Sequence, residues 1–287
     1  MWAAVIVNTS KKEALKFLPK LICKLDELEI VPVMFESVRN FYYSEKVRYI
    51  SNSECLITES CDVVITVGGD GTIIHMASHC AEADKPLLGI NFGRVGFVAT
   101  MEPDEISELS KLKDGNYFCE ERMMLRISVI GNSFYEEFYA INDAVISRGS
   151  LSRMMDLSVY ANSQHICDYR ADGLIFSTPT GSTAYSLSAG GPVISPDMSC
   201  ILLTPICPHS LFSRSVLFRD SDVINVRARG TNGFDTEAFL TIDGQKHIHL
   251  GDNTEVTTEK CKKSLKLISI KPQNFYTVLN NKLNERG

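Results

Sequence analysis

The sequence lacks the marks of membrane, secreted and nucleic-acid-binding proteins. No apolar run approaches the ~20 residues that span a bilayer, and the apolar start Met1–Val7 is too short and lacks the basic residues of a signal peptide. Lysine and arginine (29 together) are outnumbered by aspartate and glutamate (35), for a formal charge of −6. That balance argues against a general nucleic-acid binder, which usually carries a basic domain or stripe. We expect a cytoplasmic protein that binds neither a membrane nor nucleic acid.

Paired cysteines are also lacking. The nine cysteines are scattered singly, with no Cys-x-x-Cys spacing. An odd, unclustered set suits a reducing compartment better than a disulfide framework. Cys55 and Cys61 are close enough in sequence to be neighbours, but buried structural thiols are the favoured interpretation.

What is present has the composition of a soluble globular protein, 44% hydrophobic and 22% charged, and its 287 residues suffice for one large domain or two ordinary ones. The first third alternates strand-like and helix-like segments. We predict strands over 3–7, 30–35, 62–67 and 86–90, and a helix over 11–28 with an apolar stripe at helical spacing. This alternation predicts an α/β domain with a parallel, Rossmann-like sheet.

From about Glu120 the pattern changes to short strands with little helical period. The strand candidates are 124–130, 133–145, 156–160, 173–177, 222–227 and 238–243. We therefore expect an α/β domain over 1–118 and a β-rich domain over 119–270. The last segment, 271–287, contains a helix-like stretch over 275–283 that we expect to pack back on the first domain.

The most informative stretch is 62–72, where an apolar, β-branched run stops at Gly68-Gly69-Asp70-Gly71-Thr72 and a helix-like segment follows. This pattern predicts a buried strand that delivers a glycine-rich turn to the edge of a sheet. Such a turn lets backbone N–H groups approach a phosphate closely. Asp70 does not favour a phosphate by its charge, so it suits metal binding or removal of a proton from an attacking hydroxyl. The pattern indicates phosphoryl transfer to an alcohol.

A simpler interpretation remains open at this point, namely a tight β-to-α connection in which Asp70 caps the helix. The turn has neither the Gly-Lys-Ser/Thr ending of a P-loop nor the Gly-x-Gly-x-x-Gly spacing of a dinucleotide-binding turn.

A second stretch, 170–192, runs from a strand into a loop dense in hydroxyls and glycine, with a helix expected from about Thr183. Such a loop can offer many hydroxyl and N–H donors to a polar ligand, with Tyr185 available to stack on it. The alternative is a surface turn rich in serine and threonine, which are good turn formers.

Together, these stretches resemble a known family. Gly68–Thr72 resembles the Gly-Gly-Asp-Gly motif shared by NAD kinases, diacylglycerol and sphingosine kinases and phosphofructokinases, and 172–185 resembles the second signature of NAD kinases. Further stretches match NAD kinases in the same order, namely 88–97, 206–211 with Arg214, and 242–245. The resemblance implies phosphorylation of the adenosine ribose 2′-hydroxyl of NAD by ATP or polyphosphate to give NADP.

The resemblance also implies roles for particular residues. Asp70 is the implied proton acceptor and an NAD contact, and the implied donor-phosphate loop consists of Gly68, Gly69, Gly71 and Thr72. Asp143 stands where the family has Glu; the aspartate side chain is one methylene shorter and keeps the charge. His209 is an additional candidate ligand contact. The other implied NAD contacts are Gly71, His75, Asn142, Asp143, Arg153, Arg170, Asp172, Thr183, Ala184, Tyr185, Ser186, Leu187, Ser188 and Gln245.

Metal is implied by the reaction and not by a ligand cluster. Mg²⁺ would arrive with the phosphate donor, held by phosphates and one or two carboxylates, with Asp70 as the plausible protein partner. His75 and His79 lie four residues apart on one helical face, but no third zinc ligand is evident, so we predict no dedicated metal site.

Three alternatives are weighed against an NAD kinase. A lipid kinase or a phosphofructokinase would share only the first motif. A non-catalytic NAD sensor would have no use for the charge of Asp70. Family membership further implies a homodimer or homotetramer, whereas the preferred donor, the choice between NAD and NADH, and feedback by NADP or NADPH do not follow from the sequence.

Overall fold

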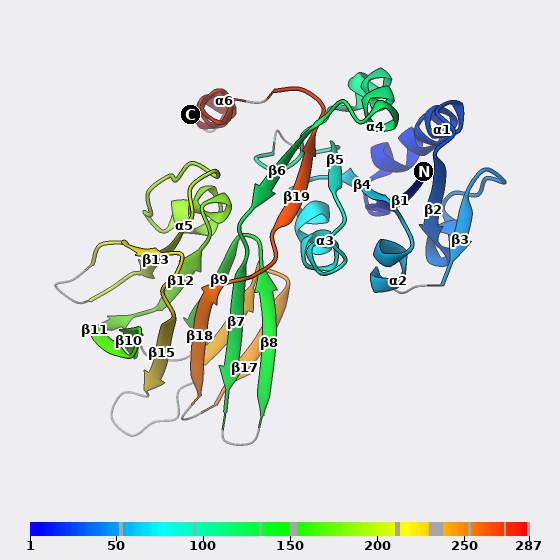
Figure 1. Ribbon diagram of the computed structural model, residues 1–287. Coiled ribbons are helices and arrows are strands. Elements are labelled where there is room, and N and C mark those ends of the chain that lie inside the picture. Colours follow the sequence, from blue (N-terminus) through cyan, green and yellow to red (C-terminus); the bar gives the residue numbers. More distant parts are fainter. Residues whose placement is uncertain are drawn as a thin grey trace. The chain divides into compact units, whose positions relative to one another are not determined.

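The computed structural model describes residues 1–51, 54–93, 96–131, 134–149, 154–209, 213–229, 238–251, 254–272 and 274–285. The chain divides into two compact units, the first made of Met1–Arg122 and Leu265–Gly287 and the second of Met123–Ser264. Figure 1 shows the course of the chain through both units. Among the described residues, no helix has the length and apolar character needed to cross a membrane.

The first unit is built on a seven-stranded sheet. Its strands follow the order β3 (Arg48–Ile50), β2 (Val31–Phe35), β1 (Trp2–Val7), β4 (Val63–Gly68), β5 (Leu87–Asn91), β19 (Leu265–Ser269) and β6 (Phe118–Arg122). Neighbouring strands are parallel except for β19 and β6. Strand β4 is buried along its whole length, as expected for a strand covered on both faces.

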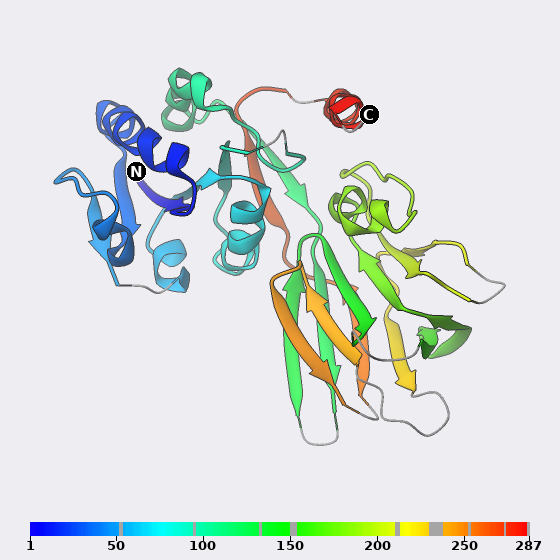
Figure 2. The same ribbon diagram turned by 180° about the vertical axis from the view of Figure 1, so that it is seen from behind.

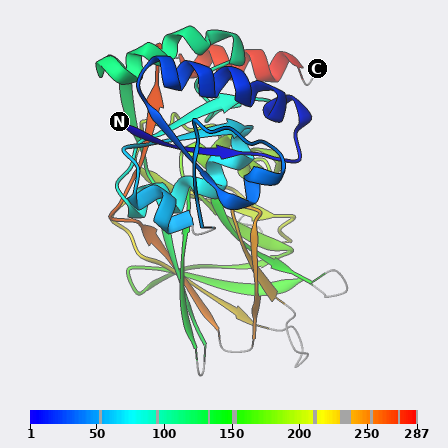
Figure 3. The same cartoon turned by 90° about the vertical axis from the view of Figure 1, so that its right-hand side faces the viewer.

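Helices cover this sheet. Helix α1 (Lys12–Glu27) buries the predicted apolar stripe, and its side chains share a core with those of the 3₁₀ helix η2 (Pro103–Leu109) and helix α4 (Ser110–Asp114). Figure 3 shows α1 and α4 on one side of the sheet and α2 (Glu54–Glu59) and α3 (Asp70–Glu82) on the other. The short η1 (Glu36–Asn40) follows β2.

The last helix, α6 (Phe275–Glu285), belongs to the first unit, where the rings of Phe275 and Phe97 lie 6.1 Å apart. The predicted return of the C-terminal helix to the α/β part is confirmed, as is the predicted fold class.

The second unit contains two six-stranded antiparallel sheets (Figure 2). The first has the order β11 (Gln164–Ala171), β10 (Met155–Ala161), β15 (Ile224–Arg229), β18 (Glu255–Lys260), β7 (Leu125–Ile130) and β8 (Tyr135–Ala140). The second has the order β14 (Val216–Arg219), β13 (Cys200–Ile206), β12 (Gly173–Ser177), β9 (Asp143–Arg148), β16 (Ala238–Ile242) and β17 (Lys246–Leu250).

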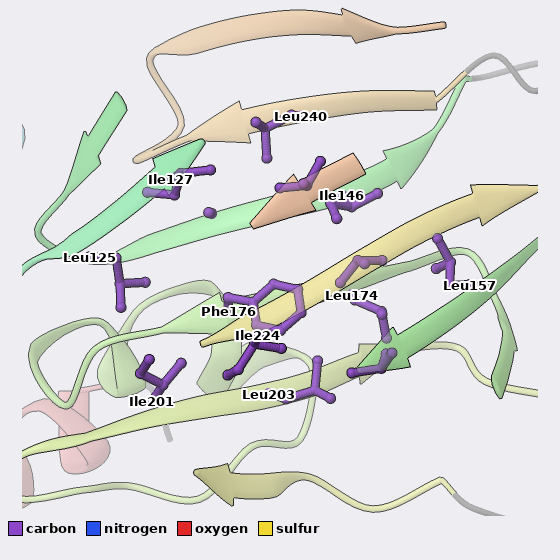
Figure 4. Close-up of a cluster of buried hydrophobic side chains, with 14 of the residues drawn as sticks. Leu125, Ile127, Ile146, Leu157, Leu174, Phe176, Ile201, Leu203, Ile224 and Leu240 are labelled. Carbon is purple, nitrogen blue, oxygen red and sulfur yellow. The ribbon is translucent and has the colours of Figure 1, made fainter. Parts of the chain in front are cut away.

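Apolar side chains from both sheets form one core. Leu125, Ile127, Leu157 and Ile224 of the first sheet cluster with Ile146, Leu174, Phe176, Ile201, Leu203 and Leu240 of the second (Figure 4). Burial alternates along β10, as expected for a strand with one face on the core.

Two predicted elements differ from the structure. The strand predicted over 133–145 is two strands, β8 and β9, separated at Ile141 and Asn142. The helix predicted from Thr183 is the 3₁₀ turn η3 (Thr180–Thr183) followed by the single-turn helix α5 (Tyr185–Ser188). The break between β8 and β9 has a clear cause in the site described below.

Candidate active site

The glycine turn connects β4 to α3 in the first unit. A side chain on Gly68 would overlap the Thr72 hydroxyl, so that position requires glycine for space. Gly69 has an ordinary extended backbone (φ −114°, ψ −172°), but a Cβ there would lie 3.1 Å from Nζ of Lys11. At Gly71 a Cβ would meet no atom within 4 Å. The turn is thus packed tightly on one side and open at Gly71.

Asp70 begins α3, and its carboxylate is held by the loop that follows β5. Oδ2 accepts a hydrogen bond from the N–H of Phe97 (2.9 Å) and Oδ1 one from the N–H of Ala99 (3.2 Å). A side chain on Gly96 would overlap this carboxylate. Because each carboxylate oxygen has two lone pairs, the oriented group can still accept a proton or bind a cation.

His75 is exposed on α3, one turn after the glycine turn, with His79 a turn further on. Within the described part of the chain, no group of three His, Cys, Asp or Glu side chains is arranged to hold a metal ion. The absence of a dedicated metal site stays a prediction.

In the second unit, the break between β8 and β9 is held by Asp243, at the end of the β16 hairpin. Its carboxylate accepts three successive backbone hydrogen bonds, from the N–H groups of Ile141 (2.9 Å), Asn142 (2.8 Å) and Asp143 (2.9 Å). From the other side, Thr178 donates its N–H to the Asn142 carbonyl (2.9 Å) and its hydroxyl to the Ile141 carbonyl (2.5 Å). These bonds replace the ladder bonds that a continuous strand would make.

The same arrangement brings Asp143 and Tyr185 together. Asp143 is 5% exposed, and its carboxylate accepts a hydrogen bond from the Tyr185 N–H. Burial, reinforced by the neighbouring Asp243 carboxylate and opposed by the Tyr185 N–H, raises the pKa of Asp143 to about 7. Burial likewise raises the pKa of Asp243, opposed by its three N–H bonds. Asp143 thus lies against the backbone of the second predicted signature.

The side chains of 183–188 divide into buried and exposed groups. The Thr183 hydroxyl donates to the Thr180 carbonyl (3.1 Å), and the fully buried Ser186 hydroxyl bonds with that of Thr204 (2.8 Å). Tyr185 is 46% exposed, Ser188 is exposed, and Ala184 and Leu187 are partly exposed. Any ligand contact by Ser186 would therefore come from its backbone.

Arg170, Asp172 and His209 form a second group. Asp172 accepts a hydrogen bond from Arg148 Nε (2.7 Å), in an ion pair with both side chains about a third exposed. The His209 N–H donates to the Arg170 carbonyl (2.7 Å), and both of these side chains are exposed.

These two groups lie at opposite ends of the β9–β12 ladder. Asp143 pairs with Ser177, whereas Asp172 immediately precedes Gly173, which pairs with Ser147. At about 3.4 Å per residue, the two ends are roughly 17 Å apart along the strand. The predicted contacts thus fall into two clusters, one at each end of this ladder.

Gln245 is exposed in the turn between β16 and β17, two residues after Asp243, and its N–H donates to the Ile242 carbonyl (2.9 Å). Several other predicted positions lie outside the described residues. These are Arg153, the Arg94–Val95 and Ser210–Leu211 parts of the family motifs, and the side chain of Cys55.

Three residues that the sequence did not single out have prominent contacts here, namely Lys11, Arg148 and Asp243. Arg148 pairs with the predicted Asp172, Asp243 holds the predicted Asn142–Asp143, and Lys11 lies against the predicted Gly69. Only Asp243 had a signal in the sequence, as part of the 242–245 motif.

Comparisons with known proteins match both parts of the chain to NAD kinases. The model of the ATP-NAD kinase N-terminal domain matches residues 4–117, and that of the ATP-NAD kinase C-terminal domain matches residues 141–270. The NAD kinase of Thermoanaerobacter sp. (strain X514) is 38% identical over 285 residues, covering 98% of both chains. The NAD kinase of Solibacter usitatus (strain Ellin6076) is 38% identical over 283 residues, covering 98% of this chain and 96% of its own.

Solved structures show the same fold. An NAD kinase from Archaeoglobus fulgidus, crystallised in complex with ATP, superposes with a TM-score of 0.76 at 27% identity over 100% of both chains. The yeast NADH kinase, crystallised with NADH, superposes with a TM-score of 0.89 over 99% of this chain and 87% of its own. At 24% identity, the yeast enzyme supports the fold alone.

The matched domains and fold define the class, a kinase that transfers a phosphoryl group to an alcohol acceptor. The chain belongs to the NAD kinase family. The resemblance inferred from the two motifs is confirmed, and the lipid kinase and phosphofructokinase alternatives are set aside.

Proposed function

We propose that this chain phosphorylates the 2′-hydroxyl of the adenosine ribose of NAD to give NADP, with ATP or polyphosphate as donor and Mg²⁺ as the accompanying cation. Family membership supports the reaction. The observation that carries the role of Asp70 is its carboxylate, which two backbone N–H groups hold in one orientation beside the open side of the glycine turn.

The proposed step is an in-line transfer. The ribose 2′-oxygen forms a bond to the terminal phosphorus of the donor, and the bond from that phosphorus to the bridging oxygen breaks, leaving its electron pair on the departing ADP or shortened polyphosphate. Asp70 accepts the proton of the 2′-hydroxyl. Since such transfer depends mainly on positioning and electrostatics, one oriented acceptor and a cradle of N–H groups are sufficient protein contributions.

In the second unit, the proposed NAD contacts lie at the two ends of the β9–β12 ladder. Asn142, Asp143 and the backbone of 183–188 are assigned to the adenosine part, and Asp172 to the nicotinamide end. The separation of about 17 Å between Asp143 and Asp172 along the ladder suits the two ends of an extended dinucleotide. His75, Arg170, Gln245 and His209 are assigned further contacts because they are exposed and polar.

Mg²⁺ is assigned to Asp70 and the donor phosphates. Carboxylate oxygen is the ligand type that Mg²⁺ takes from proteins, usually from one or two residues with phosphates completing the set. When bound, Mg²⁺ supplies neutralisation of phosphate charge. The Asp70 carboxylate, with lone pairs remaining on both oxygens, fits this requirement.

Replacement of Asp70 tests the proposal and separates an enzyme from a sensor. Purified protein is supplied with Mg²⁺, NAD and either ATP or polyphosphate, and NADP is measured with an NADP-specific dehydrogenase. We expect Asp70→Asn to lower kcat by about 10²–10⁴-fold, the usual contribution of a general base. Calorimetry with NAD should show affinity within a few-fold of the natural protein.

A sensor would give the opposite result, NAD binding without NADP from any donor and no response to Asp70→Asn beyond a small change in affinity. We further expect a homodimer or homotetramer, which light scattering coupled to size-exclusion chromatography would measure.

A further inference from the structure

One cation lies against the glycine turn and has no role in the function proposed so far. Lys11 precedes α1, in the connection from β1, and its side chain is half-buried. Its Nζ donates a hydrogen bond to the Phe92 carbonyl at 2.9 Å. A Cβ built on Gly69 or on Gly93 would lie 3.1 Å from Nζ in either case. The ammonium group therefore lies beside two glycines that follow neighbouring parallel strands, in space that a side chain on either glycine would enter.

Backbone contacts join those two glycine segments into one surface. The Phe92 N–H donates to the Gly68 carbonyl (2.5 Å), and the Gly93 N–H donates to Oδ1 of Asn91 (3.0 Å). Asn91, 4% exposed, is itself held by Glu102 through its amide nitrogen (3.0 Å). Lys11 thus lies at the carboxyl ends of β4 and β5, the edge at which open α/β sheets bind ligands.

The charge of Lys11 is not explained by its contact with Phe92. An ammonium group has three N–H donors, and the described residues supply one acceptor, a neutral carbonyl, and no carboxylate partner within ion-pair distance. A neutral side chain of similar length would satisfy that carbonyl equally well. Partly desolvating a cation without an anionic partner is unfavourable, so an anion from solution is the missing partner that the geometry favours.

We infer that Lys11 binds the transferring end of the phosphate donor, the terminal phosphates of ATP or of a polyphosphate chain. The ammonium group makes charge-assisted hydrogen bonds to phosphate oxygens through the N–H donors that the Phe92 carbonyl does not use. Gly69 and Gly93 leave the space in which this ammonium group lies. It also offsets the negative charge that Asp70 contributes to the same turn. This assignment rests on the proposed function, because it names the residue that recognises the donor in that reaction.

The test is a split between the two Michaelis constants. Lys11→Gln keeps an N–H donor for the Phe92 carbonyl but removes the charge, and Lys11→Met removes both. We expect each to raise the KM for ATP and for polyphosphate about tenfold, or about 1.4 kcal/mol of lost binding, with the KM for NAD changed less than twofold. Lys11→Arg should recover most of the affinity. Lys12→Met, which removes a charge from the exposed neighbouring residue, should leave both constants unchanged.

A purely structural Lys11 predicts a different pattern. Lys11→Gln would then match the natural protein, and Lys11→Met would lower the melting temperature without a selective change in donor KM; either result overturns the assignment. Binding of MgATP and of polyphosphate, measured by calorimetry, keeps the test independent of turnover. Absence of NADP formation by the natural protein would refute the proposed function. Equal binding of MgATP and polyphosphate by the natural protein and by Lys11→Gln would refute the role of Lys11.

Discussion

Among single residues, Asp143 carries the clearest pH signature. Its pKa of about 7 is well above the value near 3.9 expected in the unfolded chain. Between these values the folded protein holds more protons than the unfolded chain, so this group lowers stability as the pH rises from about 4 to about 7. Above pH 7, Asp143 is ionised in both states, and the folded protein bears the full free-energy cost of its buried charge.

Asp143→Asn should therefore stabilise the protein more at pH 8 than at pH 5. The amide oxygen can still accept the Tyr185 N–H, while the buried charge beside Asp243 is removed. The gain has an upper bound of about 4 kcal/mol, the equivalent of the pKa shift. Denaturant melts at both pH values measure it. An equal shift at pH 5 and pH 8 would contradict the assignment of this charge to the folded state.

Gly71 supplies a second test at this scale. An alanine Cβ there would meet no protein atom, so Gly71→Ala should fold normally and, within α3, gain up to about 1 kcal/mol. If donor phosphate lies against this turn, the added methyl group should lower kcat/KM tenfold or more. Full activity of Gly71→Ala, with a melting temperature equal to or above that of the natural protein, would mean that no ligand approaches Gly71.

The residue-level predictions from sequence were limited by distance along the chain. Asp70 and its turn could be recognised because the strand, the glycines and the carboxylate are contiguous. Lys11 could not be recognised from the sequence, because it comes to lie beside Gly69 and Phe92 only when β1, β4 and β5 are parallel neighbours. Arg148 was missed for the same reason, since it reaches Asp172 across 24 residues.

At the scale of elements, the break between β8 and β9 is the feature that presents Asn142 and Asp143. The stretch 133–145 has the composition of one strand. The carboxylate of Asp243, about a hundred residues later, nevertheless accepts hydrogen bonds from three of its N–H groups. Strand propensity is overridden by this tertiary contact. The polar pair Asn142-Asp143 is compatible with a bend in a strand, but no residue near it indicates that Asp243 holds it.

Asp243→Ala should be strongly destabilising. It would leave three N–H groups buried without their acceptor, at about 1–3 kcal/mol each, so we expect a loss of about 3 kcal/mol or more in the free energy of unfolding. The KM for NAD should rise in whatever fraction folds. Asp168→Ala, at an exposed position of the same unit, serves as the control and should cost about 0.5 kcal/mol or less. Equal losses in both variants would refute the anchoring role of Asp243.

At the scale of the whole molecule, the chain crosses from the first unit to the second and returns. Strand β19 inserts between β5 and β6, pairing with β6 along five residues from Leu265 to Ser269. The α/β and β-rich fold classes could be predicted because each follows from local alternation of strands, helices and turns. The neighbours of β19 could not be predicted, because they come from distant parts of the sequence: Leu267 of β19 pairs with Leu87 of β5.

Truncation tests this return. A chain ending at Ser264 lacks β19 and α6, leaving β5 and β6 without their shared neighbour, and we expect the first unit to unfold and donor binding to be lost. A chain ending at Pro272 keeps β19 and removes α6 alone. It should retain a cooperative thermal transition by circular dichroism. Comparable folding of both truncated chains would show that β19 is dispensable.

The most direct test of the whole account is the product of the natural protein itself. Purified chain is incubated with NAD, MgATP or polyphosphate, and the product is offered to an NADP-specific dehydrogenase, with Asp70→Asn in parallel. We predict NADP from the natural protein and a loss of about 10²-fold or more with Asp70→Asn. No product from any donor, or undiminished NADP formation by Asp70→Asn, would contradict the role assigned to the glycine turn and its carboxylate.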